Sequence, residues 1–390
     1  MLEIFGVSES YKLPDAIMTE LLSNCPENIL QKIKDNEISD LRDYYQNEQG
    51  DRKNLKQDFT PNCICELIGK ITLDGECLDM CAGTGALTKV VCKNKIYEQE
   101  FSERTIAFNL LDACLNGLEG IIEQADCLRG TVEKRYILKR FGSFSKIIQV
   151  DDKPKKTEQK FKNVIMNPPY SMTFPDAKDF RFYDFEVPKS KADYAFVLNG
   201  LKHLDEKGQL VAVLPHGVLF RGQKEGKIRE WLVKQNLIYA IIGLPNNMFL
   251  NTGIPVFLMI LRHNSDGVLF IDGSKKCIKN GKLNIMQKQH IVDIVQTFNK
   301  RSEIEKFAHL ATKAEIQDNN YNLNIPRYVN TFEAEPLPDM DVTLKELNDI
   351  EHQIQKCKQE LALMLSELTA SSAKDRQVIE TTKHFLMEEF

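Results

Sequence analysis

Cys77-Leu-Asp-Met-Cys-Ala-Gly-Thr-Gly-Ala-Leu-Thr88 is the stretch that decides the fold. Its first four residues predict a short buried strand, its glycines a tight turn, and the residues from Ala86 onward the start of a helix. Gly83 and Gly85 allow positive φ and close approach of a ligand, and Asp79 at the strand end can accept a hydrogen bond from a cationic amino group. Such a glycine pair is also common in ordinary strand–helix turns, and the third glycine of a dinucleotide fingerprint is missing, so a pyrophosphate cofactor is disfavoured.

Acidic residues close the next two predicted strands. The segment Ile96-Tyr-Glu-Gln-Glu100 ends in Glu100, with Glu98 as the weaker rival, and the segment from Gly120 ends in Asp126. In a doubly wound sheet, the acid that closes the second strand binds ribose hydroxyls, and Asp126 is suited to an adenine amino group. Taken singly, each acid is better explained as a solvated strand-end charge. Together with Asp79, Glu100 and Asp126 make three acids in register at successive strand ends, which are not easily explained in that way.

The motif Asn167-Pro-Pro-Tyr170 follows an apolar run, Phe161 to Met166, as a loop leaving a strand would. The Asn167 side-chain carbonyl and the backbone carbonyl of the next proline can both accept hydrogen bonds from one planar amino group, which makes that nitrogen a better nucleophile. The prolines fix φ near about −65° and remove backbone donors, so the loop can hold its carbonyls forward. Tyr170 offers a flat face on which an extruded base can stack. By itself the motif fits a proline-rich turn equally well, so its context decides.

With these residues in place, the chain resembles an N6-adenine DNA methyltransferase, and more narrowly the methylation subunit of a type I restriction-modification system. Gln57-Asp-Phe-Thr-Pro61 resembles the segment that closes over S-adenosylmethionine in that family. Downstream blocks also resemble that subunit family and follow in the same order: Pro188–Phe196, Val213–Gly222, Ile242–Phe249 and Tyr321–Val329. The resemblance extends from roughly Gln57 to Val329.

The resemblance implies a set of site residues. The cofactor S-adenosylmethionine is expected to bind Gln57, Phe59, Thr60, Pro61, Asp79, Ala82, Gly83, Thr84, Gly85, Glu100, Asp126 and Asn167. The catalytic residues are expected to be Asn167, Pro168, Pro169 and Tyr170, which would act on the N6 amino group of an adenine flipped from double-stranded DNA. No metal is expected to take part.

Other assignments stay open on the residues alone. The same loop also serves enzymes that methylate a base in RNA or a protein glutamine, because each substrate presents a planar amine. A solitary DNA adenine methyltransferase and a catalytically silent assembly subunit are further alternatives. The intact Asn167, Tyr170, Gly83 and Glu100 argue against the silent subunit.

Apolar periodicity predicts an α/β fold with a Rossmann-like methyltransferase sheet. Strand-like segments occur near 77–80, 95–100, 120–124, 161–166, 209–214, 237–243 and 254–261. Residues 244–253 between the last two segments are too few for a crossover helix, so the final pair is expected to be antiparallel. The resemblance implies the same arrangement, a sheet of seven strands with the last one antiparallel.

Further regions are expected on either side of this sheet. The N-terminal stretches 16–22 and 29–38 look helical, and no chemistry is visible there. The expected boundaries are 1–50 for a short N-terminal helical region, 51–270 for the catalytic domain, 271–340 for a C-terminal extension, 341–372 for a coiled-coil-like helix and 373–390 for a tail.

The C-terminal helix carries an apolar seam at alternating spacings of three and four, formed by Leu347, Ile350, Ile354, Cys357, Leu361, Met364 and Leu368. The pattern fits a helix packed on its own domain, and it also fits a coiled-coil surface for a second subunit. In the resembled family, helices in this region pair with the specificity subunit. Only about 75 residues lie between Leu261 and the C-terminal helix, too few for a target-recognition domain, and no insertion elsewhere is large enough, so sequence choice is expected to be delegated. The resemblance implies as partners the specificity subunit, a second copy of this chain and a restriction subunit.

The net charge is −5 at pH 7, which is unexpected for a protein that would have to hold DNA alone. Lysines between Lys153 and Lys191 are compatible with a basic rim around the catalytic loop and equally with a solvated loop. Much of the phosphate neutralisation is therefore assigned to a partner.

Composition bears on the compartment. Met1 to Gly6 lack the basic start of a secretory signal, and no apolar run is long enough to span a bilayer. The 10 cysteines form neither a zinc pattern nor a convincing disulfide framework. A bacterial cytoplasmic protein is expected.

Overall fold

The computed structural model describes the chain except for positions 37, 39–40, 42–43, 46–58, 93–94, 151–158, 175–181, 251, 332–338 and 388–390. Its described residues divide between two compact units, Met1–Thr331 and Phe332–Phe390. Gln57 lies outside the described residues, as do Lys153, Lys155, Lys156 and Lys178.

The first unit is built on one sheet, with strand order β13-β10-β8-β9-β7-β6-β1-β2-β3-β4-β5. The strands that correspond to the predicted segments are β1 (Cys77–Met80), β2 (Lys95–Glu100), β3 (Glu119–Asp126), β6 (Phe161–Met166), β7 (Leu204–Pro215), β8 (Ile238–Gly243) and β9 (Val256–Arg262). The strand β9 lies between β7 and β8 and is antiparallel to both. The expected methyltransferase-like sheet with an antiparallel last strand is therefore confirmed.

Within the described residues, the sheet nevertheless has 11 strands, more than the seven expected. The additional ones are β4 (Thr131–Phe141) and β5 (Phe144–Val150) at one edge and β10 (Val268–Asp272) and β13 (Ala308–Ala311) at the other. The β4–β5 hairpin lies at an edge of the sheet. In β4, charged residues lie between the buried Val132 and Tyr136 and after the buried Leu138, so this strand contains no long apolar run that would mark a central strand. A separate small hairpin is formed by β11 (Ile278–Asn280) and β12 (Leu283–Ile285).

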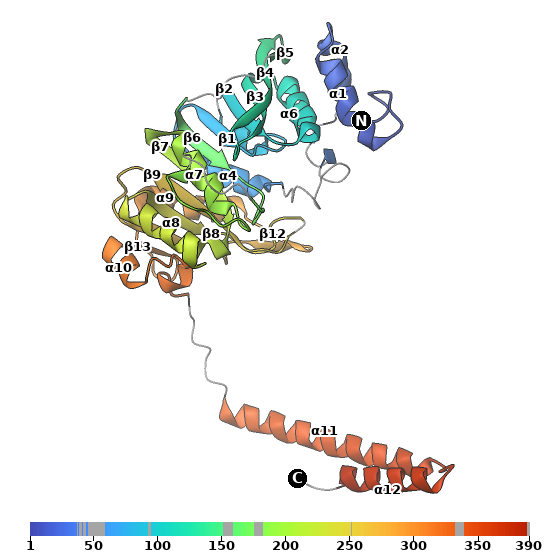
Figure 1. The fold of residues 1–390 in the computed structure, drawn as a ribbon. Helices are drawn as coiled ribbons and strands as arrows, with labels where there is room; N and C mark the ends of the chain where they lie inside the picture. Colours follow the sequence, from blue (N-terminus) through green and yellow to red (C-terminus); the bar gives the residue numbers. More distant parts are fainter. Residues whose placement is uncertain are drawn as a thin grey trace. The chain divides into compact units, whose positions relative to one another are not determined.

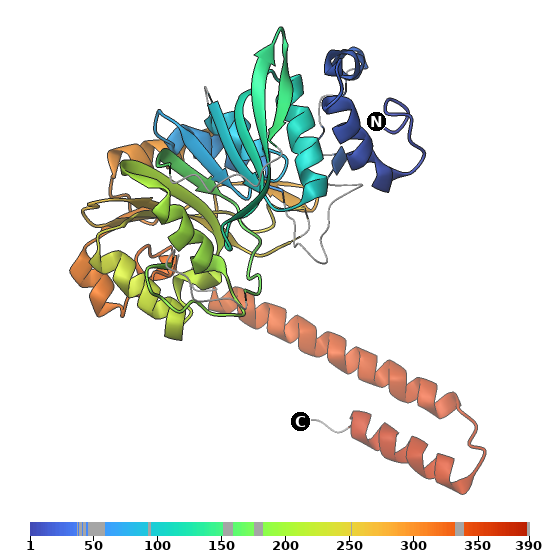
Figure 2. The same cartoon turned by 45° about the horizontal axis from the view of Figure 1, so that its top comes forward.

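Helices cover both faces of the central strands (Figures 1 and 2). Along β6, Val164 and Met166 face one core cluster and Ile165 faces the other, as the two-residue repeat of a strand requires. The cluster around Val164 includes α7 (Asp193–Lys202) and α8 (Gln223–Lys234). The cluster around Ile165 includes α4 (Asn62–Ile71), α5 (Ala86–Val91) and α9 (Lys288–Lys300). Strands buried on both faces account for the apolar runs seen in the sequence.

The N-terminal helices form a third core cluster. It combines α1 (Leu13–Leu21) and α2 (Pro26–Asp35) with α6 (Glu103–Leu115) and the β4–β5 hairpin. Shorter helical segments complete the first unit: η1 (Ser10–Lys12), η3 (His216–Leu219), α10 (Lys313–Asp318) and η4 (Ile325–Arg327). The boundaries expected near residues 50 and 270 both fall within this unit, because β10 and β13 belong to the same sheet as the catalytic loop.

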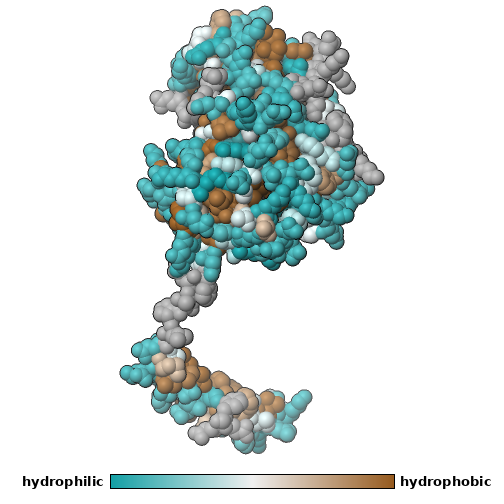
Figure 3. Space-filling model, turned by 90° about the vertical axis from the view of Figure 1, so that its left-hand side faces the viewer, coloured by the Kyte–Doolittle hydropathy of each residue, from teal (hydrophilic) through white to brown (hydrophobic). Residues whose placement is uncertain are grey.

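The second unit is a helical hairpin of α11 (Met340–Glu367) and α12 (Ala373–Met387), so a helix occupies most of the stretch expected to be a tail. Ala362 is buried in this unit, whereas Leu347, Ile350 and Ile354 of the apolar seam are each about half exposed. Figure 3 shows apolar side chains on the surface of this hairpin. Among the helices that the structure describes, none has the length and apolar character needed to cross a bilayer.

The sheet and the block Tyr321–Val329 are joined by an aromatic stack. The rings of Phe270 on β10 and Tyr328 lie 3.9 Å apart with an interplanar angle of 9°. We expect Phe270→Ala to lower the free energy of unfolding by about 3–5 kcal/mol, because it leaves a cavity beneath a buried ring. Denaturant unfolding followed by fluorescence of Trp231, the one tryptophan in the sequence, measures this loss. The control Phe141→Ala removes a ring that is 50% exposed and should cost less than about 1 kcal/mol; equal losses would contradict the prediction.

Candidate active site

Strand register brings the predicted site residues together at the carboxyl ends of the central parallel strands. The strand β1 lies between β2 and β6, with Met80 opposite both Gln99 and Met166. These pairs are parallel, so the loops that follow the three strands leave from the same edge. The strand β3 continues the pattern, with its Gln124 opposite Glu100. The glycine turn, the two strand-end acids and the Asn-Pro-Pro-Tyr loop thereby become neighbours.

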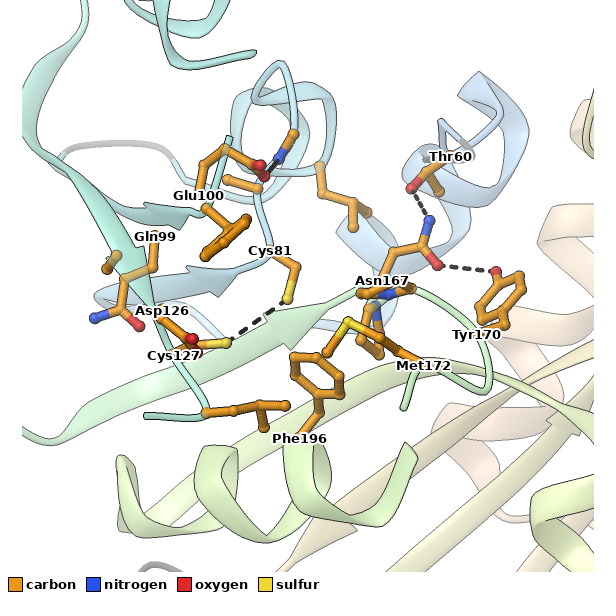
Figure 4. A pocket seen from close by; sticks show the side chains of 18 of the residues that line it. Thr60, Cys81, Gln99, Glu100, Asp126, Cys127, Asn167, Tyr170, Met172 and Phe196 are labelled. Carbon is orange, nitrogen blue, oxygen red and sulfur yellow. Dashed lines mark hydrogen bonds between the residues drawn. The ribbon is translucent and has the colours of Figure 1, made fainter. Parts of the chain in front are cut away.

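Together these loops enclose a cavity of about 310 Å³ (Figure 4). The expected residues that line it are Phe59, Thr60, Ala82, Gly83, Thr84, Glu100, Asp126, Asn167, Pro168, Pro169 and Tyr170. Pro61, Asp79 and Gly85 do not line it. Pro61 immediately precedes α4, and Gly85 immediately precedes α5 with φ of +78°, so both shape the backbone beside the cavity.

The glycine turn is tied to Glu100. Gly83 has φ of +59°, a conformation that favours glycine, and its backbone N–H donates to Glu100 Oε2 at 2.9 Å. The other carboxylate oxygen, Oε1, accepts from the Ser102 backbone N–H at 2.8 Å. Burial raises the pKa of Glu100, although these backbone donors oppose the rise. The carboxylate is thus held in one orientation at the cavity wall.

Glu98, the weaker rival, does not line the cavity. Its Oε2 accepts from Asn109 Nδ2 at 2.5 Å, behind the turn. Burial raises the pKa of Glu98 to about 7. Of the two acids on β2, the structure therefore places Glu100 where a ligand could meet it.

Asp79 is fully buried beneath the turn. Its Oδ2 accepts from Thr88 Oγ1 at 2.8 Å, whereas Oδ1 has no hydrogen-bond partner within the described part of the chain. Burial, reinforced by the charge of Glu98, raises the pKa of Asp79 well above its usual range. In the cavity wall, Thr84 Oγ1 also has no partner among the described residues. Buried polar atoms without partners are rare in folded proteins, and such an atom in a cavity wall favours a polar ligand.

The amide of Asn167 is oriented by neighbours on both sides. Its Nδ2 donates to Thr60 Oγ1 at 2.9 Å, and its Oδ1 accepts from the Tyr170 hydroxyl at 2.9 Å (Figure 4). The Tyr170 ring packs edge-on against Phe249, with the ring centroids 6.0 Å apart. The Asn-Pro-Pro-Tyr motif is therefore an ordered loop whose amide group is fixed by hydrogen bonds.

Further lining residues were not expected from the sequence. They are Cys81, Ala86, Leu87, Gln99, Phe101, Ala125, Cys127, Leu128, Arg129, Met172, Thr173, Phe174 and Phe196. Six of these 13 directly flank an expected residue, and a wider window around each strand end would have included them: Cys81, Ala86, Gln99, Phe101, Ala125 and Cys127. Phe196 comes from α7, and only its place in the block Pro188–Phe196 pointed to it. The Sγ atoms of Cys81 and Cys127 lie 3.9 Å apart in the wall.

The basic rim around the catalytic loop is not seen for Lys160 and Lys162. Their ammonium groups donate to the backbone carbonyls of Lys202 and Lys207, respectively. Both lysines lie at the start of β6, whereas the catalytic loop follows its end. The lysines are close to the catalytic loop in sequence but not in space, because the two ends of an extended strand lie far apart.

Comparison with known proteins agrees with this geometry. A model of the N-6 DNA methylase family matches residues 39–336, which include every described residue of the cavity wall. The chain belongs to the N-6 DNA methylase family.

Relatives of this N-6 DNA methylase family chain include subunits of restriction enzymes. The type I restriction enzyme MpnII methylase subunit of Mycoplasma pneumoniae is 30% identical over 367 residues, which are 85% of this chain and 65% of that protein. The MjaVII methylase subunit of Methanocaldococcus jannaschii is 34% identical over 209 residues, 48% of this chain and 36% of that protein. This chain therefore spans about two thirds or less of the length of these relatives.

A solved structure is similar as well. The methyltransferase subunit of a type I restriction-modification system from Streptococcus thermophilus is 36% identical, with a TM-score of 0.60. The match covers 70% of this chain and 59% of the other chain.

The buried acid Glu98 makes stability depend on pH. Its folded pKa, about 7, lies above the ordinary value of 4.5, so its contribution to stability is fully present below about pH 4.5 and is lost as the pH rises through 7. We expect Glu98→Gln, which does not titrate, to gain up to about 3 kcal/mol relative to the wild type between about pH 5 and 8. Denaturant unfolding across this range measures the difference, and parallel pH profiles for the two proteins would contradict it.

Proposed function

We propose that this chain methylates N6 of adenine in DNA at specific sites, with S-adenosylmethionine as the methyl donor. The observation that carries the proposal is the Asn167 amide, which Thr60 and Tyr170 orient in the wall of the cavity that also contains Glu100 and the glycine turn. The Asn167 carbonyl, which could accept from a planar amine, therefore shares a cavity with groups suited to a nucleoside cofactor.

The cavity residues fit S-adenosylmethionine. Glu100, already fixed by two backbone donors, has lone pairs left for the ribose hydroxyls. Thr84 Oγ1 has no hydrogen-bond partner among the described residues and could bond to a polar group of the cofactor. Asp126, held by the Arg129 backbone N–H at 2.9 Å, is suited to the adenine amino group. Leu128 supplies an apolar wall for the ring. Bound there, the cofactor would supply an electrophilic methyl group on a sulfonium centre.

The catalytic loop would act on the target base. Extrusion of an adenine costs a few kcal/mol of unstacking, which stacking on Tyr170 recovers in part. Asn167 Oδ1 and the Pro168 carbonyl would accept the two N6 hydrogens and direct the nitrogen lone pair toward the methyl group. Pro169, in the same wall, limits the backbone freedom of the loop. The extra proton leaves after transfer, when the amine is cationic and acidic.

Asn167→Ala tests this assignment. We expect methyl transfer to fall by at least about 100-fold, because the acceptor for the developing charge on N6 is lost. The unfolding midpoint should stay close to that of the wild type. The assay follows tritium from labelled S-adenosylmethionine into unmethylated genomic DNA.

Tyr170→Phe is the matched control. It keeps the stacking ring but removes the hydroxyl that bonds to Asn167 Oδ1, so a smaller loss is expected. Full activity of the Asn167→Ala protein would contradict the assignment of Asn167 as a catalytic residue.

We further propose that the chain works as the modification subunit of a type I restriction-modification complex. The segment after β9 contributes β10 and β13 to the main sheet and α9 to its core, so these described residues do not form a separate recognition domain. The net charge of −5 also favours a partner that neutralises phosphates. Sequence choice would lie with a specificity subunit, in a complex that includes a second copy of this chain and, in the restricting form, a restriction subunit.

Co-purification with the products of neighbouring genes tests the complex. The purified assembly should methylate adenine in genomic DNA at one motif, whereas the chain alone should not. RNA and protein substrates in parallel reactions separate the proposal from base methylation in RNA and from glutamine methylation. Methylation of one defined DNA motif by the chain alone would contradict delegated specificity.

The apolar seam of α11 is the proposed contact with the specificity subunit. Ile354 in this seam is 49% exposed, and α12 leaves it uncovered within the second unit. We expect Ile354→Glu to weaken co-purification with the specificity subunit by at least about tenfold, because a buried unpaired charge costs several kcal/mol.

Gln355→Glu is the matched control, since it adds the same charge one residue away on the exposed polar side of α11. It should leave co-purification unchanged. Equal effects of the two substitutions would exclude the seam as the contact.

A further inference from the structure

Two of the downstream blocks, Pro188–Phe196 and Val213–Gly222, meet beside the catalytic loop at a fully buried carboxylate. Asp193, the first residue of α7, is 0% exposed. Its Oδ1 accepts from the backbone N–H of Ser171 at 2.9 Å. Ser171 directly follows Tyr170, so Asp193 holds the chain at the point where it leaves the Asn-Pro-Pro-Tyr motif.

The residue that Asp193 holds is conformationally strained. Ser171 has φ of +50°, in the left-handed region that non-glycine residues rarely adopt. Such a conformation costs on the order of 1 kcal/mol or more and persists only where the surroundings determine it. The hydrogen bond to the buried carboxylate of Asp193 is such a determinant. Without it, we expect the turn after Tyr170 to relax.

Asp193 is itself held by Arg221. The Arg221 Nη1 donates to Asp193 Oδ2 and to Glu225 Oε1, each at 3.0 Å. Glu225 approaches the guanidinium from α8, and all three side chains are mostly buried. Gly217 leaves room for this guanidinium, since a Cβ there would lie 2.5 Å from Arg221 Nε. Hydrogen-bonded charge pairs of this kind are directional, so they fix the geometry of the groups they join.

Backbone hydrogen bonds extend the same connection. The Ala192 N–H donates to the Met172 carbonyl at 2.9 Å, and the Phe174 N–H donates to the Lys189 carbonyl at 2.7 Å. The segment that follows Tyr170 is therefore attached to the block Pro188–Phe196 at three successive points. On the other side of the loop, the Tyr170 hydroxyl bonds to Asn167 Oδ1.

We propose that Asp193 is a positioning residue for methyl transfer: held by Arg221, its carboxylate fixes Ser171 and thereby the Tyr170 ring and the Asn167 amide. Asp193 does not touch the reacting atoms in this scheme, and its effect passes through the loop. The inference rests on the proposed function for its kinetic consequence, whereas the anchoring of the loop is independent of it. It also assigns a role to Asp193 and Arg221, which lie in two of the downstream blocks and do not line the cavity.

Asp193→Ala in the full chain, within its co-purified complex, is the test. Hydrogen–deuterium exchange of a peptide covering 167–174 should rise, because the Ser171 amide loses its acceptor. The kcat on genomic DNA should fall by at least about tenfold, since misplacement of about 1 Å is costly in a catalytic site. The Kd for S-adenosylmethionine should stay within about twofold of the wild type, because Asp193 is not among the cavity-lining residues.

Glu225→Ala is the matched control. It removes the other carboxylate from the same guanidinium and leaves the Asp193–Ser171 hydrogen bond in place. Exchange in 167–174 and kcat should both stay within about twofold of the wild type. In Asp193→Ala, Arg221 retains Glu225 as a partner, so neither variant leaves an unpaired buried cation. Asp193→Asn keeps an amide oxygen for the Ser171 N–H and should restore part of the lost kcat.

Three outcomes would overturn the proposal. They are a kcat for Asp193→Ala within twofold of the wild type, an equal rise of exchange in Glu225→Ala, and a rise of exchange throughout the sheet that marks general destabilisation. Failure of the wild-type complex to methylate any DNA overturns the proposed function instead. In that case the exchange comparison still decides whether Asp193 anchors the loop.

Discussion

The parallel register of β2, β1 and β6 is the constraint on which the rest of the structure depends. It places Gln99, Met80 and Met166 side by side, so the next residues of all three strands leave the sheet at one edge. Each loop then needs to travel only a few residues to reach the common cavity. The apolar packing on both faces of β6 holds this register, because a slip of one residue would turn Ile165 and its neighbours to the wrong core.

Around this edge, polar groups are ordered by hydrogen bonds before any ligand enters. Backbone N–H groups orient Glu100. The Asn167 amide is oriented by Thr60 and Tyr170, and Asp193 holds Ser171 behind the loop. Pre-orientation of this kind lowers the entropic cost of forming a reactive arrangement. Burial of the acids beneath the turn raises their pKa values, which costs stability at neutral pH. The buried acids Asp79 and Glu98 beside the candidate site therefore lower the stability of the folded chain at neutral pH.

Sequence patterns predicted the central part of the fold well and its margins poorly. The bounds of β1, β2 and β6 agree with the predicted segments. The strand β6 is buried on both faces and contains an apolar run, whereas the ends of β1 and β2 were predicted from the glycine turn and the acid Glu100. Charged residues separate the apolar residues of β4, the strand beside the edge strand β5, so its pattern is weaker. The strand β10 (Val268–Asp272), which spans the boundary expected at residue 270, was not predicted. In the cavity, the glycine turn, the strand-end acids Glu100 and Asp126 and the Asn-Pro-Pro-Tyr loop were predicted. Phe196 on α7 was not, because its approach depends on how a helix packs across the sheet.

By itself the sequence determined the chemistry that is possible: an amide and two prolines after a strand, acids at successive strand ends, and a glycine turn. These are local properties, since backbone conformation and strand-end position follow from neighbouring residues. Only the tertiary structure decided which of these groups share a cavity. Glu100 lies in the cavity wall, whereas Glu98 lies behind the turn. Lys160 and Lys162 lie at the end of β6 away from the catalytic loop. Asp193 lies within hydrogen-bond distance of Ser171. The reason is that strand pairing and helix packing join residues far apart in the chain, and no local pattern encodes those distances.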